Sequence, residues 1–209
     1  MLATLLTLAD SRLPTGGHVH SGGVEEAVTS GLVVDLPTLE AFLRRRIRSH
    51  GLVTASIAVA VHSGALNPDD ADRETDARTP SPAARAASRA QGRGLLRLAR
   101  RVWPAANWSK LGRTPHLAVV AGVVGRAGDV APEHSALALV YTTMTGSATA
   151  AQRLLALDPA DVAALTFTLS ELCEGTAAEA AAGLADLSDP LLDVLAQRHA
   201  ARERPLFNS

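Results

Sequence analysis

Two histidines on a glycine-rich loop are the residues of this sequence best placed for metal chemistry. His18 and His20 are separated by one residue, Asp10 lies a few positions upstream, and glycine pairs stand on both sides. Imidazole nitrogens are common ligands of transition metals, so the two side chains could hold such an ion. The interpretation that we favour is a polar turn whose histidines cap backbone groups or face a partner protein. The other histidines stand at scattered single positions without the spacing of a metal-binding helix motif, so a stable metal site within one chain is not indicated.

The sequence lacks the motifs of a nucleotide-binding site and of a hydrolase active site. The loop from Thr15 to Gly23 lacks the lysine and the following serine or threonine with which a P-loop contacts phosphates and magnesium. No serine stands between the glycines of a nucleophile elbow, so a hydrolase triad is not indicated. We therefore expect no catalytic residue and no cofactor. An enzyme with an unrecognised site is the alternative, and such an enzyme would turn over a substrate without partners.

A row of arginines is the best-defined surface feature. Beyond Pro82 an arginine recurs every four residues, so these side chains form a slowly winding basic ridge on one helix. The ridge could dock an acidic partner, or it could be a solvated face partly neutralised by the acidic cluster between Asp69 and Asp76. Both interpretations stay open at this point. The ridge consists of Arg85, Arg89, Arg93, Arg97 and Arg101.

Length and composition favour one cytoplasmic helical domain. The chain has 209 residues, enough for a single hydrophobic core. Hydrophobic residues make up 47% and aromatic residues only 3%, so the core must consist of Leu, Val and Ala on closely packed helices. The net charge of −1 gives no reason to expect a nucleic-acid partner. No apolar run approaches the roughly 18 residues of a membrane span, and the single cysteine, Cys173, favours a reducing compartment.

Apolar periodicity and helix-terminating residues place the helices that must position these side chains. Asp158-Pro159 and Asp189-Pro190 each supply a cap and a first-turn proline, which predicts a helix after each pair. Small side chains around Gly146 predict that one long helix is central, because neighbouring helices can approach it closely. The acidic segment 67–82 is expected to be a connector or a short exposed helix. The other helices are predicted at about residues 2–9, 24–32, 36–62, 82–101, 116–124 and 133–157.

These elements predict an all-α fold. We expect a single-domain helical bundle of roughly eight to ten helices over residues 1–209. The N-terminal segment is expected to be flexible, and so is the C-terminal tail from about residue 202 to 209. The tail carries Leu206 and Phe207 beyond the last helix, without an apolar partner nearby in sequence.

The segment from Asp10 to Glu25 carries a resemblance to a known family. It reads Asp-Ser-Arg-Leu-Pro-Thr-Gly-Gly-His-Val-His-Ser-Gly-Gly-Val-Glu and resembles the N-terminal signature of the UreF family of urease accessory proteins. The Gln91-Gly92 pair is similar to the mid-chain Gln-Gly helix of that family. The segment from His116 to Gly122 and the Leu206-Phe207 tail are also similar to UreF sequences, so the resemblance extends over nearly the whole chain.

Membership of that family would imply a scaffold rather than an enzyme. UreF proteins are all-helical and form dimers, and they bind the accessory protein UreD, also called UreH, and the GTPase UreG. The resulting complex acts on apo-urease and helps to deliver nickel, while GTP hydrolysis resides in UreG. This implication agrees with the missing P-loop. A nickel-binding carrier that uses His18 and His20 is the alternative.

We expect the partner contacts to come from the signature, the basic ridge and the tail, while the long helices provide a rigid body and a dimer interface. The expected partner-binding residues are Asp10, Leu13, Pro14, Gly16, Gly17, His18, His20, Gly23, Glu25, Arg89, Gln91, Arg93, Arg204, Leu206 and Phe207.

Overall fold

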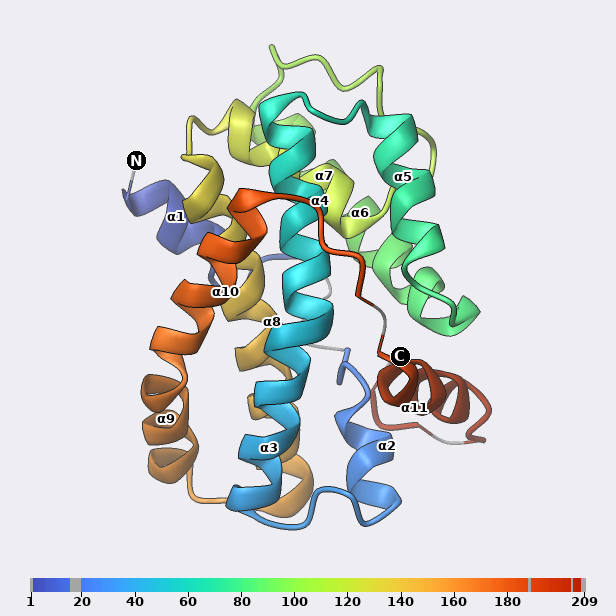
Figure 1. Cartoon of the computed structure of the whole chain (residues 1–209), viewed down its shortest axis with the longest axis vertical. Coiled ribbons are helices and arrows are strands. Elements are labelled where there is room, and N and C mark those ends of the chain that lie inside the picture. The colour runs from blue at the N-terminus through green and yellow to red at the C-terminus, as the bar shows by residue number, and fades with distance from the viewer. Residues whose placement is uncertain (1, 16–19, 188, 204, 208–209) are drawn as a thin grey trace.

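The computed structural model describes residues 2–15, 20–187, 189–203 and 205–207, and these residues fold into a helical bundle without a β-strand (Figure 1). None of the described helices is both long enough and apolar enough to cross a membrane. The helices are α1 (Leu2–Leu8), α2 (Val24–Thr29), α3 (Leu36–Arg46), η2 (Ile47–Gly51), α4 (Leu52–Ser63), α5 (Pro68–Ala77), α6 (Pro82–Val102), α7 (Leu117–Ala127), α8 (Pro132–Leu155), α9 (Pro159–Thr168), α10 (Ser170–Ala182) and α11 (Pro190–Ala200).

Helices α3 and α4 form one continuous rod through the five-residue π-helical turn η2. The rod begins at Asp35, whose side chain accepts a hydrogen bond from the backbone N–H of Thr38 in a capping box. It ends at Gly64, whose φ of 82° is a left-handed conformation that suits glycine. Counted with this rod as one element, the described residues contain ten helices, and the prediction of an all-α bundle of eight to ten is confirmed.

Helices α4 and α8 are the centre of the bundle. Helix α4 packs against α7, α8 and α10, and it is buried along most of its length. Helix α8 also contacts α2, α3 and α9, as the small residues in its middle predict. Ala148, Ala150 and Ala151 of α8 are buried against these neighbours because their short side chains allow close approach.

The core divides into two hydrophobic clusters. One lies between α2, α3, α8 and α10 and includes Leu43 and Met144. The other lies between α4, α6 and α7 and includes Ile57 and Val120. Aliphatic side chains and alanines make up nearly all of both clusters, which agrees with the low aromatic content.

Two details of the sequence-based helix assignment differ in the structure. Residues 68–77 form a helix, α5, capped by Asn67, and this helix is packed rather than exposed, because Ala71 and Thr75 on its inner face are buried. The region after Asp158 contains α9 and α10 where one helix was predicted, with the break at Leu169. Neither proline nor glycine marks this break, so the sequence carries no local signal for it.

Candidate functional site

Six of the predicted partner-binding residues line one cavity of about 310 Å³ inside the bundle. They come from the N-terminal signature, from α6 and from the C-terminal tail, which are far apart in sequence. The fold therefore gathers at one place segments that the family resemblance links to one function. The six residues are Asp10, Leu13, His20, Gly23, Gln91 and Phe207.

The other predicted residues are distributed differently. Pro14, Glu25, Arg89, Arg93 and Leu206 lie outside the cavity wall, although Glu25 and Leu206 are bonded to each other near it. Four predicted residues lie outside the described part of the chain, namely Gly16, Gly17, His18 and Arg204.

Asp10 stabilises the turn that begins the signature. Its carboxylate accepts hydrogen bonds from the backbone N–H of Arg12 at 2.8 Å and from Nη2 of Arg12 at 2.6 Å. The side-chain hydrogen bond with Arg12 lowers the pKa of Asp10 to about 2, so the carboxylate is charged at neutral pH. Leu13, which follows this turn, lines the cavity.

Gly22 lets the signature pass closely over a guanidinium group. Its φ is 62°, and a Cβ at this position would lie only 2.5 Å from Nη2 of Arg46. Arg46 in turn donates a hydrogen bond from Nη1 to the carbonyl oxygen of Gly22 at 2.7 Å. A side chain at position 22 would therefore be excluded both by the backbone conformation and by Arg46.

Gly92 of the Gln-Gly pair allows a second close approach. It is buried in α6, and a Cβ there would overlap the carbonyl of Pro115 and the backbone of His116. The segment before α7 can therefore lie directly on α6. Gln91, the preceding residue, lines the cavity.

Glu25 connects the signature to the C-terminal end of the chain. Its side chain is buried, and its Oε2 accepts a hydrogen bond from Nε2 of His199 at 2.6 Å. The backbone N–H groups of Leu206 and Phe207 donate to the same carboxylate at 2.8 and 3.0 Å. Burial raises the pKa of Glu25, but the hydrogen bonds from Leu206, His199 and Phe207 outweigh it and lower that pKa overall.

The tail thus has a partner that lies 181 residues away in sequence rather than nearby. Phe207 packs against the core cluster between α2 and α8, whereas Leu206 is 79% exposed. Arg202 adds an ion pair with Glu26 at 2.9 Å. The predicted flexibility of residues 202–209 stays a prediction.

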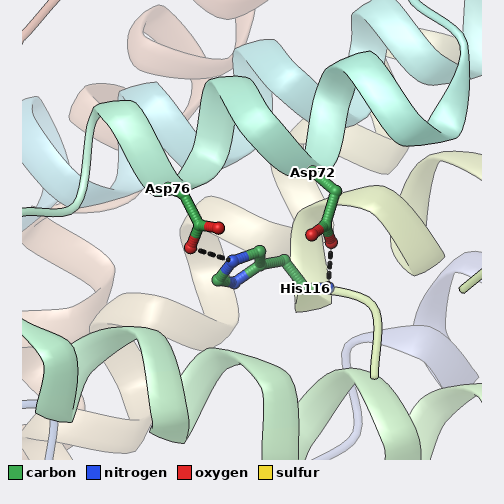
Figure 2. A group of neighbouring side chains, drawn as sticks. All are labelled: Asp72, Asp76 and His116. Atoms are coloured by element: carbon green, nitrogen blue, oxygen red, sulfur yellow. Dashed lines mark hydrogen bonds and ion pairs between the residues drawn. The ribbon is translucent and has the colours of Figure 1, made fainter. Parts of the chain in front are cut away.

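Arg89 of the basic ridge is bound within the chain. Its Nη2 lies 2.8 Å from a carboxylate oxygen of Asp72 and 2.8 Å from one of Asp76, and Nη1 donates to the carbonyl of Thr114 at 2.6 Å. Figure 2 shows Asp72 and Asp76 pointing from one helix, α5, toward His116. His116 Nε2 lies 2.9 Å from Asp76, and its backbone N–H donates to Asp72 at 3.1 Å.

This network joins α5 to α6 by ion pairs and α5 to the start of α7 by hydrogen bonds. Burial lowers the pKa of His116, and the hydrogen bond to Asp76 only partly opposes that effect, so the ring is neutral at pH 7. Asp72, Asp76 and His116 are the one group of three potential metal ligands among the described residues. The guanidinium of Arg89 already contacts both carboxylates, so the arrangement is an ion-pair network rather than a metal site. His20 does not belong to this group.

The ridge therefore divides into two parts. Arg85 and Arg89 face the acidic helix α5, which agrees with the interpretation of a partly neutralised face. Arg93, Arg97 and Arg101 are exposed, and no ion pair of theirs occurs among the described residues. Only this second part is a free basic surface.

Sequence reasoning missed three residues that make long-range contacts in or near the signature and the cavity wall. Arg46 stands in a run of arginines that predicts nothing more than a polar face, and His199 is one of the scattered histidines. Asp189 was recognised only as a helix cap, yet it also bonds Arg45 at 2.7 Å and Ser49 at 2.9 Å. Their partners are more than 20 residues away in sequence, and no local pattern signals such contacts.

Comparison with known proteins agrees with these features. The sequence pattern of the UreF family matches residues 33–170, more than half of the chain. Proteins described as "Urease accessory protein UreF" from Mycolicibacterium vanbaalenii and Mycobacterium marinum are each 78% identical to it, over 100% of this chain and 99% of theirs. The Mycobacterium tuberculosis protein of the same description is 74% identical over the same shares of both chains. The matched pattern, the full-length relatives and the signature that the fold gathers around one cavity lead to the same conclusion: the chain belongs to the UreF family of urease accessory proteins.

Proposed function

We propose that this chain is a non-catalytic scaffold for urease maturation that binds UreD (UreH), UreG and apo-urease and promotes insertion of nickel. GTP hydrolysis takes place in UreG, and the scaffold needs no cofactor of its own. It acts in the cytoplasm as a homodimer, with the long helices as the rigid body. Partner contacts come from the signature and the tail.

The junction at Glu25 is the observation that carries this proposal. It joins the two segments that the family resemblance assigns to partner binding, because one buried carboxylate accepts hydrogen bonds from the backbone at Leu206 and Phe207. Signature and tail then offer one continuous surface to a partner. Leu206 stands on that surface as an exposed apolar side chain that can be buried by binding.

A single exposed side chain tests this surface without disturbing the fold. The Leu206→Ser variant keeps the backbone N–H that bonds Glu25, and it removes only a side chain that is 79% exposed. We expect capture of UreD by the variant to fall by about tenfold or more, the equivalent of 1.4 kcal/mol or more of binding free energy. Co-purification of tagged UreD with the variant measures this, and the Tm should stay within about 2 °C of the wild type.

The matched control is Phe167→Ser on α9, because Phe167 is also 79% exposed. In Figure 1, α9 and α11 lie on opposite sides of the bundle, and Leu206 bonds Glu25 of α2, the helix that packs against α11. The control should therefore capture UreD as well as the wild type does. If Leu206→Ser captures as much UreD as the wild type does, the proposed role of the tail is contradicted. If Leu206→Ser and Phe167→Ser lose the same amount of UreD capture, the effect is not specific to the tail.

A further inference from the structure

The π-helical turn between α3 and α4 presents an unusual set of polar side chains to the cavity. Arg46 ends α3, and Ser49 and His50 belong to η2 itself. All three line the cavity together with Asp189. Short π-helical segments within α-helices are rare and occur frequently at functional sites. This wall of the cavity has no role in the proposed docking of partners.

Arg46 is a charged group whose pairing is incomplete. Its Nε is buried without a hydrogen-bond partner, and no ion pair of Arg46 occurs among the described residues. Asp189 is the nearby carboxylate, but it is bonded to Arg45 at 2.7 Å and to Ser49 at 2.9 Å. Burial lowers the pKa of Arg46 to about 10, with Asp189 partly opposing this, so the guanidinium is still charged at neutral pH.

A partly buried cation without a counter-ion is unfavourable, because desolvation is compensated only by ion pairs and hydrogen bonds. Among the described residues, the side chain of Arg46 donates one hydrogen bond, from Nη1 to the carbonyl oxygen of Gly22 at 2.7 Å. Gly22 also packs over the guanidinium, since a Cβ on this residue would lie 2.6 Å from Cζ of Arg46. The group is therefore held in one orientation while much of its hydrogen-bonding capacity is unused.

His50 provides a second donor four residues along the same rod. Burial, together with the charge of Arg46, lowers the pKa of His50 to about 3, so the imidazole is neutral at pH 7 and carries one N–H. The ring makes no hydrogen bond with the described residues. Arg46 at the end of α3 and His50 in η2, two residues with unused donors, thus line one cavity.

From this arrangement we propose that Arg46 and His50 bind a small oxyanion of the carboxylate or bicarbonate class within the cavity. A planar guanidinium matches the geometry of such an anion, and the imidazole N–H supplies a further hydrogen bond. The cavity, at about 310 Å³, has ample room for an ion of three or four heavy atoms. A metal cation would be repelled by Arg46. The inference stands independently of the scaffold role.

Thermal unfolding of the full chain tests the site at pH 7.5, in a buffer without carboxylates. Sodium formate or sodium bicarbonate is compared with sodium chloride at equal ionic strength. Either oxyanion, at about ten times its Kd, should raise the Tm by roughly 3–5 °C more than chloride does, because a ligand that binds only the folded state stabilises it.

Three variants make the result specific. The rise should be lost in His50→Leu and in Arg46→Gln, and it should persist in Arg48→Gln, which removes a charge from the same turn but lies outside the cavity wall. Arg46→Gln can also destabilise the chain through the lost bond to Gly22, so His50→Leu decides the outcome if that variant does not fold. The proposal is overturned if chloride raises the Tm equally, if neither oxyanion raises it, or if the rise survives in His50→Leu.

Discussion

Glu25 joins helix α2 to the C-terminal tail through both oxygens of one buried carboxylate. His199, Leu206 and Phe207 all donate to it. The ionised form accepts these bonds more strongly than the protonated form does, because hydrogen bonds to a charged carboxylate are stronger and a proton would occupy one of its lone pairs. At the scale of a single residue, Glu25 is therefore the group whose charge state matters most for the surface that we assign to partners.

The pH dependence of stability follows from the lowered pKa of Glu25. Because the folded protein binds this proton more weakly than the unfolded chain does, the stabilisation is present above the unfolded pKa of about 4.5 and is lost as the pH falls through the folded pKa. Glu25→Gln should lower the Tm at pH 7 by roughly 3–8 °C, as expected when buried hydrogen bonds are lost. The difference between variant and wild type should shrink below about pH 4.5.

Thermal unfolding of both proteins between pH 3 and pH 8 measures this difference. The control is Glu40→Gln, which removes a carboxylate from an exposed i,i+4 pair with Arg44 and should cost no more than about 1 kcal/mol. A Glu25→Gln variant as stable as the wild type at pH 7 would show that the carboxylate does not fasten the tail.

At the scale of helices, sequence patterns located most elements, because their signals are local. Pro82, Pro132 and Pro159 each open a helix close to the predicted start, and Asp35 caps the rod where a helix from about residue 36 was predicted. The break at Leu169 and the π-helical turn could not be predicted in this way. Both depend on packing against other helices rather than on residues that terminate a helix.

The basic ridge on α6 gives a test at this scale. Arg89 joins α6 to α5 through Asp72 and Asp76, whereas Arg93 is exposed. Arg89→Gln should therefore destabilise the chain by about 1–3 kcal/mol, because it leaves partly buried carboxylates without their partner. Arg93→Gln should change stability by less than about 0.5 kcal/mol. Unfolding in urea measures both.

Pull-down of UreD and UreG by the same two variants then distinguishes an effect on partner binding from an effect on stability. If the free part of the ridge docks an acidic partner, Arg93→Gln should weaken capture while its unfolding midpoint stays unchanged. Two results would contradict the assignment of Arg89 to the fold and of Arg93 to a free surface. In one, Arg89→Gln unfolds at the same urea concentration as the wild type; in the other, Arg93→Gln is the less stable of the two variants.

At the scale of the whole molecule, the sequence predicts which segments bind partners but not how these segments meet. The signature and the tail are both predicted to bind partners, yet the bond between Glu25 and Leu206 spans 181 residues and has no local signature. The same holds for Arg46 beneath Gly22 and for Asp189 beside Arg45. Such contacts depend on the path of the chain through the bundle, which periodicity alone does not determine.

The central claim is that this chain matures urease by holding other proteins together and not by chemistry of its own. The most direct measurement is urease activity, with the nickel content of the purified enzyme, after co-expression of urease with UreD and UreG in the presence or absence of this chain. We expect nickel content and activity to fall at least tenfold without the chain and to be restored by the wild-type protein. Urease that matures equally well without the chain would contradict the account.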